Sequence, residues 1–349
     1  MAETKAAPPA LTRKDFISDQ IVRWCPGCGD FAILAQTQKF LPTLNIPREK
    51  FVFISGIGCA ARFPYYVDTY GFHSIHGRAP AIATGVKCAN PDLSVWVVTG
   101  DGDSLSIGTN HLIHALRRNI GINILLFNNE VYGLTKGQTS PTSRMGTKTK
   151  STPYGSIQEP MIPVSIALAA EATFVARTFD TNLDHLSEML LRAARHKGTA
   201  FIEILQNCKV FNDGAFADIT ERSHREETTL TLSHGKPLVF GKEKNKGIRL
   251  RGYVPEIVEF EPGRAPPEIL VHDEKHPDSS LAYLLSKLYT PKFPVPIGVF
   301  RDVERPTYEE LMRQQIEAVK KSRPADLQAL IAGAETWQVP AERDAEEGA

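Results

Sequence analysis

The sequence carries no excess of charge of either sign. Its 40 lysine and arginine residues balance 40 aspartate and glutamate residues, whereas a nucleic-acid-binding protein usually carries a basic stripe. Long hydrophobic runs are also missing, because no apolar stretch approaches the ~18 residues of a membrane span. The first residues, MAETKAAPPALTRKDF, lack the apolar segment of a signal peptide. We therefore expect a cytoplasmic protein that binds neither nucleic acid nor a membrane.

Cysteine is scarce as well, with only 5 residues in 349. In a cytoplasmic protein these thiols are not expected to form disulfides, which leaves metal binding, redox chemistry or simple burial as their roles. The rest of the composition, 42% hydrophobic and 23% charged, is enough to bury a full α/β core with a further segment appended.

The stretch 93–142 contains the clearest pattern of predicted strands and helices in the chain. A β-branched apolar run at 95–98 predicts a strand, and apolar residues at helical spacing from Leu105 to Leu116 predict a helix. A second apolar run, 122–127, predicts another strand. This order predicts a βαβ unit with two parallel strands. The turns after both strands then lie at one edge of the sheet, outside the carboxyl ends, where open α/β sheets bind ligands.

Polar residues follow both strands at this edge. Asp101 lies between Gly100 and Gly102 after the first strand, and Asn129 follows the second. One carboxylate and one amide oxygen, with the carbonyl of Val131 as a third ligand, suit a Mg²⁺ ion that also binds substrate phosphates. The flanking glycines let a bulky anion approach the backbone, and the N-terminus of the next helix favours phosphate. Either turn alone is explained by ordinary turn chemistry, but the pair favours a magnesium and phosphate site.

Four cysteines are expected at the same edge. Cys25 and Cys28 form a C-x₂-C turn, which by itself could be half a zinc site or a redox dithiol. Cys59 and Cys208 each follow a predicted strand, and parallel strands would bring both to the phosphate site. Four thiolates fit a [4Fe–4S] cluster or a Zn(Cys)₄ site, and the wide separation of the last two favours a cluster. Cys88 lies on a predicted helix, where a free cysteine is most often a small hydrophobe.

Several motifs then resemble a known family. GDG followed at this distance by NN resembles the fingerprint of thiamine diphosphate enzymes, and NNEVYGLTKGQTSPT resembles the β subunits of 2-oxoacid:ferredoxin oxidoreductases. The resemblance continues through WCPGCGD, GIGCAARFP, HSIHGRAPAIATGVK and CKVFND, and so covers most of residues 20–220. It implies a thiamine-diphosphate-binding fold of the pyrophosphate type. Such a fold is α/β, with a mostly parallel central sheet flanked by helices, and here we expect a C-terminal extension after it.

The resemblance also implies three cofactors, namely thiamine diphosphate, Mg²⁺ and one [4Fe–4S] cluster. The expected cluster ligands are Cys25, Cys28, Cys59 and Cys208, and the expected magnesium ligands are Asp101, Asn129 and Val131. The residues expected to contact thiamine diphosphate are Ile57, Gly58, Cys59, Ala60, His76, Gly100, Gly102, Asp103, Gly133 and Leu134.

In this family a 2-oxo acid is decarboxylated on thiamine diphosphate, electrons pass one at a time through the cluster to ferredoxin, and coenzyme A takes the acyl group. Thiamine diphosphate also needs a second α/β domain, which this chain is too short to contain. The resemblance implies that an α subunit supplies that domain, in an αβ or (αβ)₂ enzyme.

Two cations are candidates for binding the substrate. Arg62 lies shortly after Cys59, and Lys136 lies shortly after the expected magnesium turn. A buried carboxylate requires a charged partner, and Lys136 favours 2-oxoglutarate, converted to succinyl-CoA, over pyruvate or a branched-chain 2-oxo acid. Two other classes of protein stay open. A non-redox thiamine diphosphate lyase would not need the four cysteines, and a zinc-stabilised binding module would not bind the coenzyme.

The sequence divides into four segments. Residues 1–20 are polar with alanine and proline and predict a mobile arm. Residues 21–222 hold all the motifs and predict the coenzyme and cluster domain. Residues 223–340 predict hairpins followed by an amphipathic helix, as an extension without a catalytic constellation. The acidic end, 341–349, predicts a disordered tail.

Overall fold

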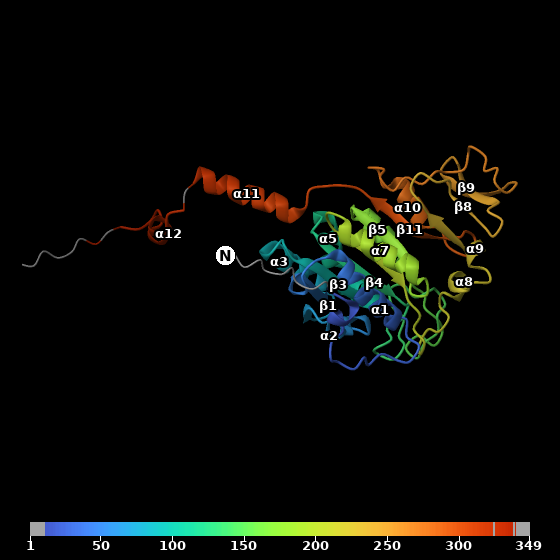
Figure 1. Ribbon diagram of the computed structural model, residues 1–349, viewed down its shortest axis with the longest axis horizontal. Helices are drawn as coiled ribbons and strands as arrows, with labels where there is room; N and C mark the ends of the chain where they lie inside the picture. The colour runs from blue at the N-terminus through green and yellow to red at the C-terminus, as the bar shows by residue number, and fades with distance from the viewer. Residues whose placement is uncertain (1–10, 324, 338, 340–349) are drawn as a thin grey trace, which may run out of the picture. The chain divides into compact units, whose positions relative to one another are not determined.

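An eight-stranded sheet lies at the centre of the protein (Figure 1). The computed structural model describes residues 11–323, 325–337 and 339. The sheet order is β2-β1-β3-β4-β6-β5-β11-β7, and β1 to β6 run parallel to one another. β11 pairs antiparallel with β5 and parallel with β7. The strands are β1 (Phe51–Ser55), β2 (Tyr70–His73), β3 (Ser94–Gly100), β4 (Ile122–Asn128), β5 (Phe174–Phe179), β6 (Ala200–Leu205), β7 (Thr229–Leu232) and β11 (Val295–Asp302).

The register of the parallel strands brings their carboxyl ends together. Gly100 at the end of β3 is paired with Phe127 of β4, and Asn128 at the end of β4 is paired with Leu205 of β6. The loops that follow these strands therefore start side by side at one edge. β1 is parallel to β3, so the loop that follows it leaves at the same edge. The expected mostly parallel sheet is confirmed.

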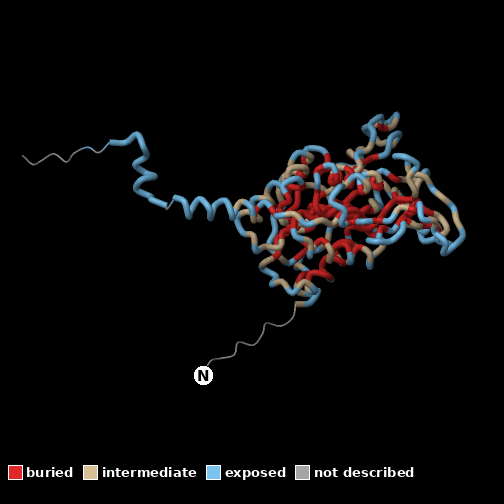
Figure 2. The backbone as a smooth tube through the Cα atoms, turned by 90° about the horizontal axis from the view of Figure 1, so that it is seen from above, coloured by how far each residue is buried: buried red, intermediate tan, exposed pale blue. Residues whose placement is uncertain are grey.

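Helices cover both faces of the sheet because its strands are buried on both sides. Ile124 and Leu126 of β4 pack with helices α3, α5, α6 and α10, whereas Leu125 and Phe127 pack with α1 and α7. Figure 2 shows the resulting band of buried residues through the middle of the main unit. These helices are α1 (Asp30–Phe40), α3 (Ala79–Ala89), α5 (Thr109–Arg118), α6 (Pro163–Ala169), α7 (Leu183–Arg195) and α10 (Ser280–Ser286).

The remaining helical turns are short. They are η1 (Arg13–Phe16), η2 (Leu41–Leu44), η3 (Arg48–Lys50), η4 (Ala60–Arg62), α2 (Phe63–Tyr66), α4 (Asp101–Leu105), α8 (Ala217–Thr220) and α9 (Arg225–Thr228). No helix among the described residues is long and apolar enough to cross a bilayer.

The helix expected from Leu105 to Leu116 is wrong as a single element. It is divided into α4 and α5 by a break at 106–108. The break allows a close approach, since a Cβ atom on Gly77 would lie 2.5 Å from the Cα of Gly108. The loop before α3 is thereby held against the start of α5. The helix that directly follows Gly100 is α4, which is only five residues long. Its dipole therefore contributes less to phosphate binding than the dipole of the longer helix that we expected.

The mobile arm expected at residues 1–20 is wrong for the part that the structure describes. Phe16 is fully buried and packs edge to face against Phe51, with ring centroids 5.7 Å apart. Ile17 forms a β-bridge with Val67. Burial of one aromatic ring is sufficient to fix this segment. Residues 1–10 lie outside the described residues.

The segment after 222 contributes to two sheets. β7 and β11 extend the central sheet, and the expected hairpins form a three-stranded antiparallel sheet of β8 (Val239–Phe240), β9 (Lys246–Arg251) and β10 (Val254–Glu259). The first compact unit runs to Glu309, and a functional division at 222 stays a prediction. The expected amphipathic helix is α11 (Tyr308–Ser322), followed by α12 (Leu327–Ala332). Most of α11 belongs to a second unit that begins at Glu310, and the expected tail at 341–349 lies outside the described residues.

A buried ion pair joins β5 to β6 below the carboxyl edge. Arg177 donates to Glu203 at 2.6 Å, and both side chains are fully buried. Replacing Arg177 with methionine leaves an unpaired carboxylate, so we expect the free energy of unfolding to fall by about 3–5 kcal/mol. Denaturant unfolding followed by circular dichroism measures this loss. The double variant Arg177→Met, Glu203→Met should recover most of it, and a single variant as stable as the wild type would contradict the prediction.

Candidate functional site

Asp101 occupies a buried position at the start of α4. Its side chain is 2% exposed, and Thr142 donates to its Oδ2 at 2.6 Å. Burial raises the pKa of this carboxyl above its ordinary range. A buried carboxylate is costly unless it is paired with a cation. The position therefore fits a divalent metal ion.

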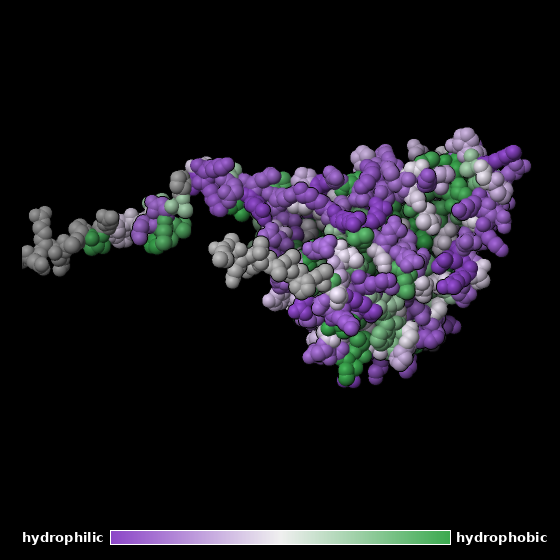
Figure 3. Space-filling model, viewed as in Figure 1, coloured by the Kyte–Doolittle hydropathy of each residue, from purple (hydrophilic) through white to green (hydrophobic). Residues whose placement is uncertain are grey.

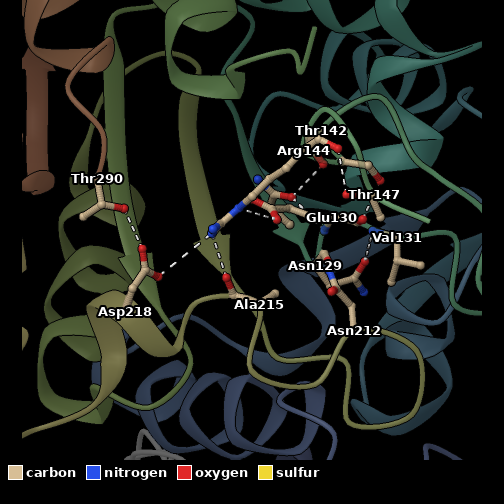
Figure 4. Close-up of polar contacts among 12 residues, drawn as sticks. Asn129, Glu130, Val131, Thr142, Arg144, Thr147, Asn212, Ala215, Asp218 and Thr290 are labelled. Carbon is tan, nitrogen blue, oxygen red and sulfur yellow. Dashed lines mark hydrogen bonds and ion pairs between the residues drawn. The ribbon is translucent and has the colours of Figure 1, made fainter. Parts of the chain in front are cut away.

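The turn after β4 holds the other two expected magnesium ligands (Figure 4). The Oδ1 of Asn129 accepts a hydrogen bond from the backbone N–H of Val131 at 3.2 Å, so the two residues form a compact turn. Glu130 between them adopts a φ of 54°, in the left-handed region. Asn212 donates to the carbonyl of Asn129 at 2.9 Å. The turn is therefore fastened to the loop that follows Cys208.

Asp103 faces the interior of the protein rather than the open edge. Its carboxylate accepts from the backbone N–H groups of Ile57 at 3.1 Å and Gly77 at 2.8 Å, and from the hydroxyl of Thr99 at 2.9 Å. The Ile57 N–H is therefore occupied by Asp103. Asp103 therefore links the loop after β1 to the loop after β2. Its carboxylate supports the edge of the sheet through these hydrogen bonds.

The glycines at the edge have two different roles. A Cβ atom on Gly58, whose φ is 133°, would meet no atom within 4 Å, and Gly100 is almost as open. Both leave room in front of the backbone. A Cβ atom on Gly102 would instead lie 2.1 Å from the ring of Tyr132. Gly102 is therefore required for packing of the protein itself.

Three further residues of the expected coenzyme site lie on these loops. The side chain of His76 is 65% exposed, and its Nδ1 lies 3.8 Å from Asp103. Ala60 is buried at the start of η4, and Leu134 is 46% exposed on the turn after the magnesium ligands. His76 is thus free to meet a ligand at the edge.

Four cysteines converge beside this turn. A Cβ atom on Gly133 would lie 3.5 Å from the sulfur of Cys208 and 3.7 Å from that of Cys59, so the missing side chain leaves a space that both sulfurs face. Cys28 closes a tight turn with Cys25 through an N–H···O bond of 3.0 Å. Burial raises the pKa of Cys59 to about 11, and the nearby Cys208 and Cys25 add to the shift. The Cys59 thiol therefore stays protonated at neutral pH until a metal replaces the proton.

Cys25, Cys28, Cys59 and Cys208 form this group. Among the residues that the structure describes, no three His, Cys, Asp or Glu side chains are close enough to hold one metal ion. Cys88 lies on α3, half-buried, outside this group.

The two candidate substrate residues lie on different loops of this edge. Lys136 is exposed on the turn Tyr132–Gln138, with a φ of 73°. Arg62 ends η4 and lines a cavity of about 400 Å³ together with Asp19, Arg23, Tyr65 and Tyr66. The two residues thus lie on different loops, Arg62 shortly after Cys59 and Lys136 shortly after the magnesium turn.

A second cavity, of about 330 Å³, lies behind the magnesium turn. Arg144 spans it, donating to Glu130 at 3.2 Å and to the carbonyl of Ala215 at 2.7 Å, while Asp218 lies 4.0 Å from the same guanidinium group (Figure 4). Burial raises the pKa of Glu130 to about 7. Sequence reasoning missed this cluster because Glu130, Arg144 and Asp218 are far from one another in the sequence and only the fold brings them together.

Comparison with known proteins identifies the domain that contains this edge. Residues 56–204 match the family model of the thiamine pyrophosphate enzyme C-terminal TPP binding domain. The 2-oxoglutarate oxidoreductase subunit KorB of Mycobacterium tuberculosis is 54% identical over 93% of this chain and 88% of its own length. The β subunit of 2-oxoacid:ferredoxin oxidoreductase 1 of Aeropyrum pernix is 50% identical over 54% of this chain and 60% of its own length.

A solved structure shares the fold. The 2-oxoglutarate:ferredoxin oxidoreductase of Magnetococcus marinus, with 2-oxoglutarate, coenzyme A and succinyl-CoA bound, superposes with a TM-score of 0.73 at 33% identity, over 92% of this chain and 95% of that chain. The fold and the site thus define a thiamine-diphosphate-binding α/β protein. More specifically, the chain belongs to the β subunits of the 2-oxoacid:ferredoxin oxidoreductase family.

Proposed function

We propose that the chain is the β subunit of a 2-oxoglutarate:ferredoxin oxidoreductase. The reaction converts 2-oxoglutarate, coenzyme A and oxidised ferredoxin to succinyl-CoA, CO₂ and reduced ferredoxin. The observation that carries the proposal is the convergence of Asp101, Asn129 and the cysteine loops at one sheet edge. The KorB relative and the M. marinus structure support 2-oxoglutarate as the substrate. Pyruvate or a branched-chain 2-oxo acid is the alternative within the family.

The residues at this edge fit thiamine diphosphate held through Mg²⁺. Asp101 supplies the one negative charge, and the Oδ1 of Asn129 and the carbonyl of Val131 supply neutral oxygens. Gly58 and Gly100 leave the open backbone against which a diphosphate can lie. Thiamine diphosphate, when bound, supplies a carbanion that attacks the ketone of the substrate. The chain itself binds, orients and shields that centre.

Cys25, Cys28, Cys59 and Cys208 are proposed to hold one [4Fe–4S] cluster. Their loops leave the same edge as the magnesium turn, so electrons travel only a short way from the coenzyme. A non-redox lyase has no use for four converging thiols. The zinc-stabilised module is disfavoured because structural zinc ligands usually come as two local pairs, whereas Cys59 and Cys208 are far apart in the sequence.

An α subunit is proposed to complete the site. The described residues hold one sheet of the coenzyme-binding kind, whereas thiamine diphosphate also needs a carboxylate against its aminopyrimidine ring. Hydrophobic residues are exposed beside the edge, with Ile75 67% and Ile107 58% exposed, and Figure 3 shows such residues on the surface of the main unit near α2. Exposed apolar surface of this kind marks an interaction site.

Anaerobic purification tests the proposal. The chain should be purified with and without its α subunit, and iron, sulfide, zinc and thiamine diphosphate should be measured in each preparation. We expect iron and sulfide in both, and oxidation of 2-oxoglutarate with ferredoxin only in the complex. Thiamine diphosphate without iron would favour the non-redox lyase. Zinc without the coenzyme would favour the binding module, and activity of the isolated chain would overturn the need for the α subunit.

Lys136 is proposed to bind the distal carboxylate of 2-oxoglutarate. In Lys136→Ala we expect kcat/KM for 2-oxoglutarate to fall by about 10- to 100-fold, since a hydrogen bond between charged groups is worth about 1.5–3 kcal/mol. The value for pyruvate, which lacks that carboxylate, should change little. Steady-state kinetics with both substrates measures the difference. Lys39→Ala, at an exposed position on α1, is the matched control, and an unchanged substrate preference in Lys136→Ala would rule out this role. Arg62→Ala, measured in the same way, tests the second candidate.

A further inference from the structure

Gln206 joins the magnesium turn to a cluster cysteine. It directly follows β6 and is 1% exposed. Its Oε1 accepts from the Nδ2 of Asn129 at 2.9 Å, and its Nε2 lies 3.4 Å from the sulfur of Cys28, to which it donates. The same Nε2 donates to the carbonyl of Asn207. One buried amide therefore contacts an expected ligand of each inorganic cofactor.

The orientation of this amide is determined by its neighbours. The carbonyl of Asn207 can only accept a hydrogen bond, so the NH₂ group of Gln206 must face it. The second N–H of that group then points to Cys28, and Oε1 remains for Asn129. The Nδ2 of Asn129 is engaged by Gln206, which turns its Oδ1 away from Gln206 and toward the Val131 side of the turn. Gln206 thereby leaves Oδ1 as the atom of Asn129 that can bind magnesium, through the lone pair that the Val131 N–H does not use.

Packing holds Gln206 in this position. Its backbone N–H donates to the carbonyl of Asn128 at 2.8 Å, which extends the pairing of β4 and β6. A Cβ atom on Gly29 would lie 2.9 Å from the Cγ of Gln206, so glycine is required there. Gly29 also donates to the carbonyl of Asn207 at 3.2 Å. The side chain is thus confined between the Cys25–Cys28 turn and the strand ends.

We propose that Gln206 is a positioning residue that raises the reduction potential of the cluster and orients Asn129 for magnesium. This inference rests on the proposed function, because it requires the cluster and the magnesium ion. A hydrogen bond to a ligand sulfur stabilises the additional negative charge of the reduced cluster. A neighbour that orients a ligand amide increases metal affinity. The Gln206 side chain thereby links a cysteine ligand of the cluster, which receives electrons, to a ligand of the magnesium ion, which binds the coenzyme.

Gln206→Met in the complete enzyme tests both effects. Methionine has a similar length and removes all side-chain hydrogen bonds. In an anaerobic redox titration followed by electron paramagnetic resonance, we expect the equilibrium constant for one-electron reduction to fall about tenfold, which lowers the midpoint potential by about 59 mV. The Mg²⁺ concentration for half-maximal binding of thiamine diphosphate should rise about tenfold.

Gln36→Met is the matched control. Gln36 is also buried, but its side chain accepts from Ser187 of α7 and contacts neither site. We expect its potential and magnesium dependence to equal those of the wild type. If Gln206→Met keeps its cluster and shows wild-type values for both, the inference is overturned.

A measurement on the wild type covers the case in which Gln206→Met loses its cluster. Among the residues that the structure describes, no other glutamine donates to a cysteine sulfur. Enzyme labelled with ¹⁵N in glutamine side chains should therefore show a nitrogen coupling to the reduced cluster in pulsed electron paramagnetic resonance. A missing coupling overturns the role of Gln206. A wild-type enzyme without any iron–sulfur signal would instead overturn the proposed function itself.

Discussion

Replacing Cys208 with serine will abolish the reduction of ferredoxin by 2-oxoglutarate. Cys208 shares with Cys59 the space that Gly133 leaves open, so its loss removes one of the proposed cluster ligands. Loss of a residue that only supports a metal ligand costs about 10- to 100-fold, and we expect loss of a direct ligand to exceed this. The measurements are iron and sulfide content, the signal of the reduced cluster, and kcat with ferredoxin.

Cys88→Ser provides the control for Cys208→Ser. Cys88 is half-buried on α3 and lies outside the converging group, so this variant should keep wild-type iron content and activity. Binding of thiamine diphosphate should survive in Cys208→Ser, because the magnesium turn is intact. A Cys208→Ser enzyme with full iron content and normal activity would remove Cys208 from the cluster.

Replacing Asp101 with asparagine will abolish binding of thiamine diphosphate. Asp101 is the only charged member of the proposed magnesium ligands, and the substitution keeps its size while it removes the charge. We expect the affinity for thiamine diphosphate in the presence of Mg²⁺ to fall more than about a hundredfold, with activity falling in parallel. Isothermal titration calorimetry measures the affinity, and Asp92→Asn, at an exposed position, should leave it unchanged.

The stability of Asp101→Asn separates a lost ligand from a damaged fold. Burial raises the pKa of Asp101, so without a metal ion its ionised form is disfavoured in the folded state. The stability associated with this carboxyl is present at low pH and is lost as the pH rises through the raised pKa. At neutral pH, Asp101→Asn without metal should therefore melt no lower than the wild type. A markedly lower melting temperature would mean that the loss of binding arises from misfolding.

Much of the fold could be predicted from local pattern. The apolar run predicted as a strand at 122–127 is β4 (Ile122–Asn128), and the strand predicted before Cys208 is β6 (Ala200–Leu205). Such elements are determined by hydrophobic periodicity, which is a property of consecutive residues. The helix predicted from Leu105 to Leu116 is divided at 106–108, where Gly108 packs against Gly77, a contact between distant segments that periodicity does not reveal.

The position of the candidate ligands at one sheet edge could be predicted, but the residues that support them could not. Asp101, Asn129 and the cysteines are found at one edge because parallel strands share an edge whatever their order in the chain. Gln206 and Thr142, which bond those residues, were missed. Gln206 carried one signal, since it is polar and directly follows a strand that ends at this edge. Thr142 ends the NNEVYGLTKGQTSPT motif, but only the course of the loop after β4 brings it to Asp101.

The sequence by itself determined that this chain has a βαβ core with polar turns after its strands, and its motifs identified the family. These properties depend on the spacing of residue types along the chain. Only the tertiary structure decided which neighbour each side chain has. It turned Asp103 inward to Ile57 and Gly77, placed Gln206 between Asn129 and Cys28, and fastened residues 11–17 to the core. Hydrogen bonds and packing between distant segments depend on where loops fold back, and this information is not contained in any local pattern.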